Sequence, residues 1–134
     1  MTMLKTPIFV YIIGEGASGG ALGIGVGNTV YMLENTWYTV IAPESCSSIL
    51  WRNWDHKEDA ANALKLTPQD ALREKFIDGI IEEPLGGAHY DPQVAYEHLK
   101  TSILHNIKAF SSFTGKELET QRQDKFIAMG QFKG

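Results

Sequence analysis

Short apolar runs separated by glycine-rich or polar residues fill the first half of the chain, and this pattern predicts buried strands joined by loops. Residues 8–13 are uniformly apolar, and residues 30–33 and 38–41 are rich in β-branched and aromatic side chains, so we expect a strand in each. A glycine-rich segment follows the first strand. It leads into residues 19–26, which we expect to form a helix packed closely on a sheet.

The second half is polar, and its apolar residues recur with helical spacing, so we expect mostly helices there. One further strand is expected over 76–81, followed by a loop over 84–89. The expected helices cover 44–51 with Ser45 as the cap, 57–66, a start at Thr67-Pro68, 92–110 with Val94, Leu99, Ile103 and Ile107 on one stripe, and 116–129. The pattern as a whole predicts an α/β protein with a helical C-terminal half.

The glycine-rich segment 14–20 is the main candidate for chemistry, because a glycine loop between a strand and a helix leaves backbone N–H groups free to bind an anion. Its first interpretation is a dinucleotide site. Gly14-x-Gly16-x-x-Gly19 matches the G-x-G-x-x-G fingerprint, and Glu34 lies about 20 residues on, where an acid would bind the ribose. The regular alternation of strand and helix that such a fold needs does not follow.

A second interpretation of the same segment is a serine hydrolase. Gly16-x-Ser18-x-Gly20 matches the nucleophile elbow, and the order Ser18, Asp78, His89 is that of the hydrolase triad. The sequence does not locate the base, and a serine at a loop-to-helix junction is more often a helix cap.

A third interpretation is an oxyanion hole without a protein nucleophile. Gly19 and Gly20 allow a ligand to approach the backbone closely, and their N–H groups would stabilise charge that develops on a carbonyl or ureido oxygen. This interpretation needs the fewest additional residues.

Composition narrows the class of protein. The chain has 134 residues, 43% of them hydrophobic, and a net charge of −4, which argues against nucleic acid or an anionic membrane as a partner. No apolar run is long enough for a membrane span. The first seven residues lack the apolar stretch and the small-residue cleavage site of a signal peptide, so we expect none. A single cysteine, Cys46, gives neither an internal disulfide nor a cysteine-rich zinc site, so we expect a reducing compartment and no bound metal.

Five strings of residues cover much of the chain. They are Ile13–Gly27 (IGEGASGGALGIGVG), Met32–Trp51, Ala63–Thr67, Ile77–Asp78 and Glu83–His89. Together they resemble the carboxyltransferase alpha subunit of bacterial and plastid acetyl-CoA carboxylase. The resemblance implies a crotonase (ClpP)-like fold, a superhelix of β-β-α units, of which this chain would be a partial domain.

The resemblance also implies a reaction and partners. The family moves a carboxyl group from carboxybiotin, held on a biotin carboxyl carrier protein, to acetyl-CoA, and so makes malonyl-CoA for fatty-acid synthesis. Its alpha subunit works with a beta subunit in an α₂β₂ heterotetramer, and the zinc belongs to the beta subunit. No tightly bound cofactor is expected in this chain. The setting would be a bacterial cytoplasm or a plastid stroma.

Site residues carry over from the resemblance position by position. Gly19 and Gly20 match the pair that holds the ureido oxygen of carboxybiotin, and we assign them the catalytic role. The positions carried over as substrate-binding are Gly16, Ala17, Ser18, Pro43, Glu44, Ser45 and His89.

The chain departs from the family pattern at Ala17, where glycine is usual, and at Tyr90, where a basic residue is usual. The family's subunit is more than twice as long. We therefore expect residues 1–134 to form one domain that matches the C-terminal part of the subunit and is truncated at the N-terminus. Two alternatives stay open: an inactive fragment that binds the beta subunit, and a crotonase-fold acyl-CoA enzyme that needs no biotin.

Overall fold

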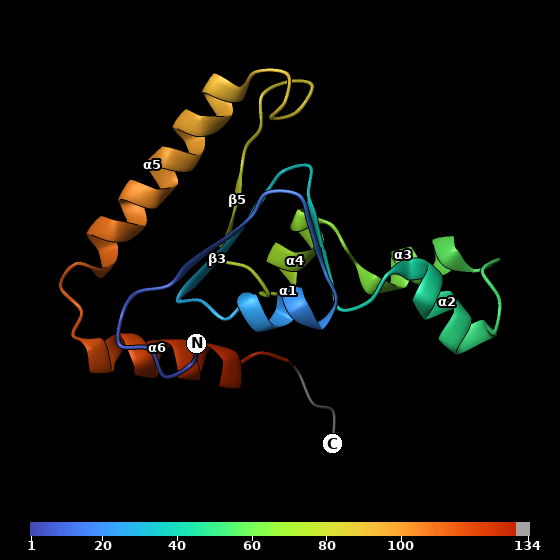
Figure 1. Cartoon of the computed structure of the whole chain (residues 1–134), viewed down its shortest axis with the longest axis horizontal. Coiled ribbons are helices and arrows are strands. Elements are labelled where there is room, and N and C mark those ends of the chain that lie inside the picture. The colour runs from blue at the N-terminus through green and yellow to red at the C-terminus, as the bar shows by residue number, and fades with distance from the viewer. Residues whose placement is uncertain (131–134) are drawn as a thin grey trace.

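A computed structural model of the chain describes residues 1–130, which contain five strands and six helices (Figure 1). Their order is β1 Phe9–Ile12, β2 Glu15–Ala17, α1 Ser18–Ile24, β3 Thr29–Leu33, β4 Trp37–Thr39, α2 Pro43–Trp51, α3 Lys57–Leu64, α4 Pro68–Arg73, β5 Gly79–Ile81, α5 Pro92–Phe110 and α6 Gly115–Ile127. All the expected strands and helices are present. The strand predicted over 76–81 is shorter, and β2 was predicted as loop.

Two successive β-β-α units build the centre of the molecule. β1 pairs in parallel with β3. After a bend β1 is followed by β2 and β3 by β4, and these two second strands also pair in parallel. β5 then adds to the other edge of β3. The first unit is β1-β2-α1 and the second is β3-β4-α2, which confirms the repeated β-β-α arrangement predicted from the sequence.

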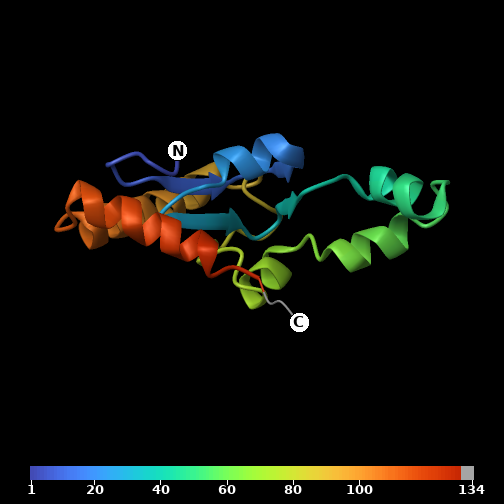
Figure 2. The same cartoon turned by 90° about the horizontal axis from the view of Figure 1, so that it is seen from below.

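The main core lies on one face of the three-stranded sheet β1-β3-β5, where Val30 lies opposite Val10, and Met32 lies opposite Ile12 and Ile80. Its buried centre consists of Val30 and Met32 of β3 with Ala71 of α4 and Ile77. Leu22 of α1, Ala71 of α4 and Phe126 of α6 line one cavity with Val30, so these three helices border the same face, with α1 beyond the β1 edge and α4 beyond the opposite edge (Figure 2). Helix α5 contacts the other face through Tyr11 and Tyr31. The strands are apolar because both of their faces are covered.

Helices α2 and α3 form a hairpin that extends away from the sheets (Figures 1 and 2). The Ser47 hydroxyl donates to the Asn53 carbonyl at 2.7 Å and closes its turn. The predicted cap was wrong: α2 begins at Pro43, and Ser45 lies within the first turn. Proline is well suited to the first helical position because its missing N–H has no partner there in any case.

Helix α5 is attached to the sheet by polar contacts and by part of the predicted apolar stripe, since Leu99 and Ile103 are half-buried whereas Val94 and Ile107 are exposed. Its buried residues are Ala95 and Asn106, whereas Ile107 of the stripe is 53% exposed. The Asn106 side chain donates to the Tyr11 hydroxyl at 2.8 Å and accepts from the Tyr31 hydroxyl at 3.4 Å. Burial raises the pKa of Tyr31. The amphipathic spacing therefore predicted the helix and half of its packing stripe, but not the buried polar residue Asn106.

Two glycines near α1 give a test of close packing. A Cβ at Gly27 would lie 2.8 Å from Val10 Cγ2 and 2.9 Å from the Ile8 carbonyl, whereas Gly23 has nothing within 4 Å. We expect Gly27→Ala to lower the free energy of unfolding by about 2 kcal/mol, because neither neighbour can move cheaply. Gly23→Ala is the matched control and should be neutral or raise it by up to about 1 kcal/mol. Urea denaturation of both variants measures this; equal effects would contradict the packing argument.

None of the helices in residues 1–130 has both the length and the apolar character that crossing a membrane requires.

Candidate active site

The carboxyl ends of the three parallel strands β1, β3 and β5 meet at one edge of the sheet, which is where ligands bind in open α/β sheets. Three segments leave the strands at this edge: residues 13–20 after β1, the corner 34–36 between β3 and β4, and residues 82–89 after β5. The corner is joined to the first segment by the Trp37 N–H, which donates to the Gly14 carbonyl at 3.4 Å. The glycine-rich segment and the Glu83–His89 string are thus brought to the same edge.

The glycine-rich segment is partly a strand. Gly16 lies opposite Tyr38, and a Cβ there would be 3.0 Å from the Tyr38 ring and 3.3 Å from Ile12, so packing alone requires glycine. Ala17 has an extended backbone with φ −131°, which any residue adopts; the departure from the family's glycine therefore needs no adjustment. Gly16 and Ala17 line a cavity of about 450 Å³ between β1, β2 and α1.

Ser18, the first residue of α1, has a left-handed backbone with φ +67°. A serine in this region costs about 1 kcal/mol or more, and such strain gathers at functional sites. The helix cap is Ala17, and no side chain caps the helix, so the cap role expected for Ser18 was wrong. The two residues that follow this turn, Gly19 and Gly20, are exposed.

Gly19 and Gly20 are exposed, and a Cβ on either would meet nothing within 4 Å. Neither has the positive φ that favours glycine. Their N–H groups lie in the first turn of α1, where a helix supplies no acceptor, and no other acceptor reaches them among the hydrogen bonds of residues 1–130. Nothing within the described chain therefore requires this glycine pair, and its backbone is open to a molecule from outside.

His89 lies beside a second cavity, of about 480 Å³, at the same edge of the sheet. Gly86 and Gly87 both have φ +94°, and a Cβ at Gly87 would be 3.3 Å from the His89 ring, so this turn needs both glycines. The cavity is also lined by residues that the sequence did not single out as site residues, namely Ile13, Asn35, Thr36 and Glu83. Glu83 was within reach of the sequence analysis, since it opens the Glu83–His89 string.

The family described as acetyl co-enzyme A carboxylase carboxyltransferase-like matches residues 1–130. The chain belongs to this family. It is 56% identical over 132 residues to the acetyl-coenzyme A carboxylase carboxyl transferase subunit alpha of Flavobacterium psychrophilum, covering 98% of this chain and 42% of that protein. The subunit alpha of Chlorobium luteolum is 55% identical over 130 residues, covering 97% of this chain and 39% of that protein. The chain thus spans about two fifths of these relatives.

Among solved structures, the chain resembles the transcarboxylase 12S crystal structure with methylmalonyl-coenzyme A and methylmalonic acid bound. The TM-score is 0.61, the identity is 16%, and the match covers 81% of this chain and 21% of that one. At this identity the likeness concerns the fold alone, and it agrees with the crotonase-like β-β-α arrangement.

The structure supports neither the serine hydrolase nor the dinucleotide-site interpretation of the glycine-rich segment. Asp78 precedes β5 at the amino end of the sheet, where it accepts from the Val30 N–H at 2.6 Å and pairs with Lys125, whereas Ser18 and His89 follow carboxyl ends. The triad is therefore not assembled. The dinucleotide fingerprint fails because residues 15–17 form a paired strand instead of a tight turn.

The other carried-over positions lie on the hairpin. Pro43 is buried, while Glu44 and Ser45 are exposed at the start of α2, and none of the three lines the cavities at the sheet edge. Their substrate-binding role stays a prediction. No group of three or more His, Cys, Asp or Glu side chains within residues 1–130 could hold a metal ion.

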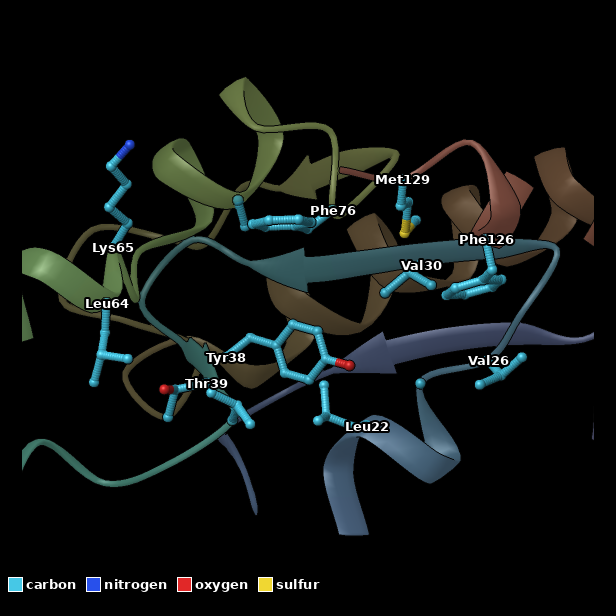
Figure 3. A pocket seen from close by; sticks show the side chains of 13 residues that line it. Leu22, Val26, Val30, Tyr38, Thr39, Leu64, Lys65, Phe76, Phe126 and Met129 are labelled. Atoms are coloured by element: carbon cyan, nitrogen blue, oxygen red, sulfur yellow. The ribbon is translucent and has the colours of Figure 1, made fainter. Parts of the chain in front are cut away.

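A third cavity, of about 430 Å³, lies between strand β4 and helices α1, α4 and α6 (Figure 3). Tyr38 projects into it, with its hydroxyl 3.5 Å from the Ala21 carbonyl, and burial raises the pKa of Tyr38. Leu22, Phe76 and Phe126 line it, while Lys65 points outward to Glu74, 2.7 Å away. This cavity lacks the converging polar groups of a reaction site.

Proposed function

We propose that this chain supplies the alpha-subunit share of a carboxyl transfer from carboxybiotin to acetyl-CoA, with malonyl-CoA as the product. Membership of the carboxyltransferase-like family and the relatives named as the alpha subunit support the reaction class. The observation that carries the proposal within the structure is the open, unpaired backbone of Gly19 and Gly20 beside the sheet edge.

The chemistry explains why such a backbone is useful. When the carboxyl group leaves the ureido nitrogen of carboxybiotin, the N–C bond breaks and negative charge moves onto the ureido oxygen. The Gly19 and Gly20 N–H groups would donate to that oxygen more strongly in the transition state than in the ground state. A new C–C bond forms at the methyl carbon of acetyl-CoA, which gives up a proton, and the ureido nitrogen takes one up.

Other residues would shape the site. Gly16, Ala17 and Ser18 hold the glycine pair outward by the strand pairing and by the turn at Ser18. We expect His89, which is exposed and lines the second cavity, to contact substrate. On this proposal Pro43, Glu44 and Ser45 bind substrate only when a partner covers the hairpin.

The proposal includes partners. Carboxybiotin arrives on a biotin carboxyl carrier protein, a beta subunit completes the site in an α₂β₂ assembly, and zinc belongs to that beta subunit. No cofactor is held tightly by this chain. The reaction would take place in a bacterial cytoplasm or a plastid stroma.

A reverse carboxyl transfer assay tests the proposal. Malonyl-CoA and biocytin are mixed with the chain and a matched beta subunit, and release of acetyl-CoA is followed. We expect turnover clearly above that of the beta subunit alone. Acetyl-CoA release that is unchanged on omission of biocytin would point instead to a biotin-independent acyl-CoA enzyme.

The projecting hairpin favours a second candidate, a fragment that binds a partner without turnover. Ile49, Leu50 and Trp54 are each more than 60% exposed on it. Exposed apolar groups of this kind mark contact surfaces. Binding of the beta subunit in sedimentation, together with no acetyl-CoA release, would establish this candidate.

A further inference from the structure

The Glu83 side chain hydrogen-bonds to two of the segments at the carboxyl edge of the sheet, although residue 83 lies on neither β5 nor a helix. One carboxylate oxygen accepts from the Asn35 N–H at 2.6 Å, and the other accepts from the Ala88 N–H at 2.8 Å. Asn35 belongs to the β3–β4 corner, and Ala88 immediately precedes His89. A single side chain therefore bridges the corner and the His89 loop.

The bridge is itself held in place. The Glu83 N–H donates to the Glu34 carboxylate at 3.2 Å, and the Glu34 N–H donates to the Ile81 carbonyl at 3.0 Å, which extends the β3–β5 ladder to this point. The Glu83 carboxylate thus accepts from the β3–β4 corner, and the Glu34 carboxylate of that corner accepts from the segment after β5. Both are acceptors only, and the groups they meet here are backbone donors.

The same corner continues to the glycine-rich segment through the Trp37 N–H and the Gly14 carbonyl. The chain of contacts runs from the His89 loop through Glu83 to Asn35, and from there to Gly14. The loop has two internal hydrogen bonds, from the Gly87 N–H to the Pro84 carbonyl at 2.8 Å and from the Tyr90 N–H to the Gly87 carbonyl at 3.0 Å. Without the Glu83 carboxylate the loop would keep its internal hydrogen bonds but lose the side-chain bridge to the β3–β4 corner.

We propose that Glu83 is the positioning residue of the site: its carboxylate fixes the His89 loop to the β3–β4 corner and so sets the place of His89 relative to the Gly19–Gly20 backbone. The expected effect on the rate rests on the proposed function, whereas the attachment of the His89 loop by Glu83 does not. A reactive group displaced by about 1 Å can lower the rate by roughly 10²-fold, so such an attachment matters for catalysis.

Glu83→Gln tests this with almost no change in shape. A glutamine has one acceptor oxygen and one NH₂, so the NH₂ must face either the Asn35 or the Ala88 N–H, and one attachment is lost. The matched control is Glu82→Gln. Glu82 is exposed, and only its backbone carbonyl, which accepts from His98 Nδ1 at 2.8 Å, takes part in the hydrogen bonds of residues 1–130.

The first measurement is amide hydrogen exchange by NMR on the full chain. We expect exchange at Ala88 or Asn35 to become at least about tenfold faster in Glu83→Gln, with protection of Val30 and Met32 unchanged and Glu82→Gln like wild type. Unaltered exchange at both Asn35 and Ala88 would overturn the proposal.

The second measurement is a double-mutant cycle in the reverse assay. We expect Glu83→Gln to lower kcat/KM by about tenfold in wild type but to have little effect in a His89→Ala background, because the loop then positions nothing. Full additivity of the two substitutions would also overturn the proposal. If wild type gives no turnover, the proposed function fails, and the exchange data alone decide the role of Glu83.

Discussion

Gly20→Val lowers carboxyl transfer by about 10²–10³-fold, which is the effect of removing one oxyanion-hole donor. A valine at this position places branched carbon atoms in the space that the structure leaves open to a ligand, and it obstructs approach to the Gly19 and Gly20 N–H groups. The fold should persist, because nothing beyond its chain neighbours and its own helix backbone lies within 4 Å of the added Cβ. The measurement is kcat/KM for acetyl-CoA release in the reverse assay with the beta subunit present.

Gly23→Val is the matched control for this prediction. Gly23 lies on the same short helix, is exposed, and likewise has nothing within 4 Å, so both variants introduce the same side chain at similar helix propensity. Activity of Gly23→Val should remain within a few-fold of wild type. If Gly20→Val were equally active, the glycine pair could not be the oxyanion site, and the proposed mechanism would have to be abandoned.

Arg122→Met lowers the free energy of unfolding by about 3 kcal/mol, the second large effect that we expect. Arg122 is fully buried, and burial lowers its pKa. Its guanidinium donates to the Asn28 side-chain oxygen at 2.7 Å, to the Thr6 carbonyl at 3.1 Å and to the Leu4 carbonyl. Methionine fills the space but leaves these acceptors without their charged donor. We expect the cost of the unsatisfied acceptors to exceed the free energy gained by no longer burying a charge.

The position of Arg122 explains why one side chain matters this much. It joins α6 to the segment before β1, while Asn28 at the start of β3 accepts from the Ile8 N–H at 3.0 Å and donates to the Leu118 carbonyl at 2.9 Å. Loss of the guanidinium therefore loosens three parts of the chain together.

Thermal and urea unfolding of Arg122→Met measure the effect, which corresponds to a fall in the melting temperature of about 10 °C. Lys116→Met on the same helix is the control. The Lys116 side chain is 73% exposed and lies 3.4 Å from the buried Glu119 carboxylate, which also accepts from Gln123 Nε2 at 3.3 Å. Because the lysine end of this pair is in water and Glu119 keeps a donor, we expect a loss of about 1 kcal/mol or less. Equal stability of the two variants would show that the buried network is dispensable.

The sequence determined most of the elements because local patterns are strong there. Apolar runs marked β1, β3 and β5, and Pro68 and Pro92 marked helix starts, where the ring suits the first helical position. The family strings around Gly19–Gly20 and Glu83–His89 identified both segments that the structure brings to the sheet edge. Residue identity alone was sufficient for these inferences.

The tertiary structure decided the features that depend on pairing between distant segments. Glu15–Ala17 looks like a loop locally, and it becomes a strand only because β4 pairs with it. The amphipathic spacing of α5 did not reveal that Asn106 would be its buried contact, since that choice depends on two tyrosine hydroxyls of the sheet. The bridge at Glu83 likewise depends on N–H groups of the β3–β4 corner and of the His89 loop. Local sequence governs backbone preference and periodicity, whereas a partner strand, a buried donor or a distant acceptor exists only once the chain has folded.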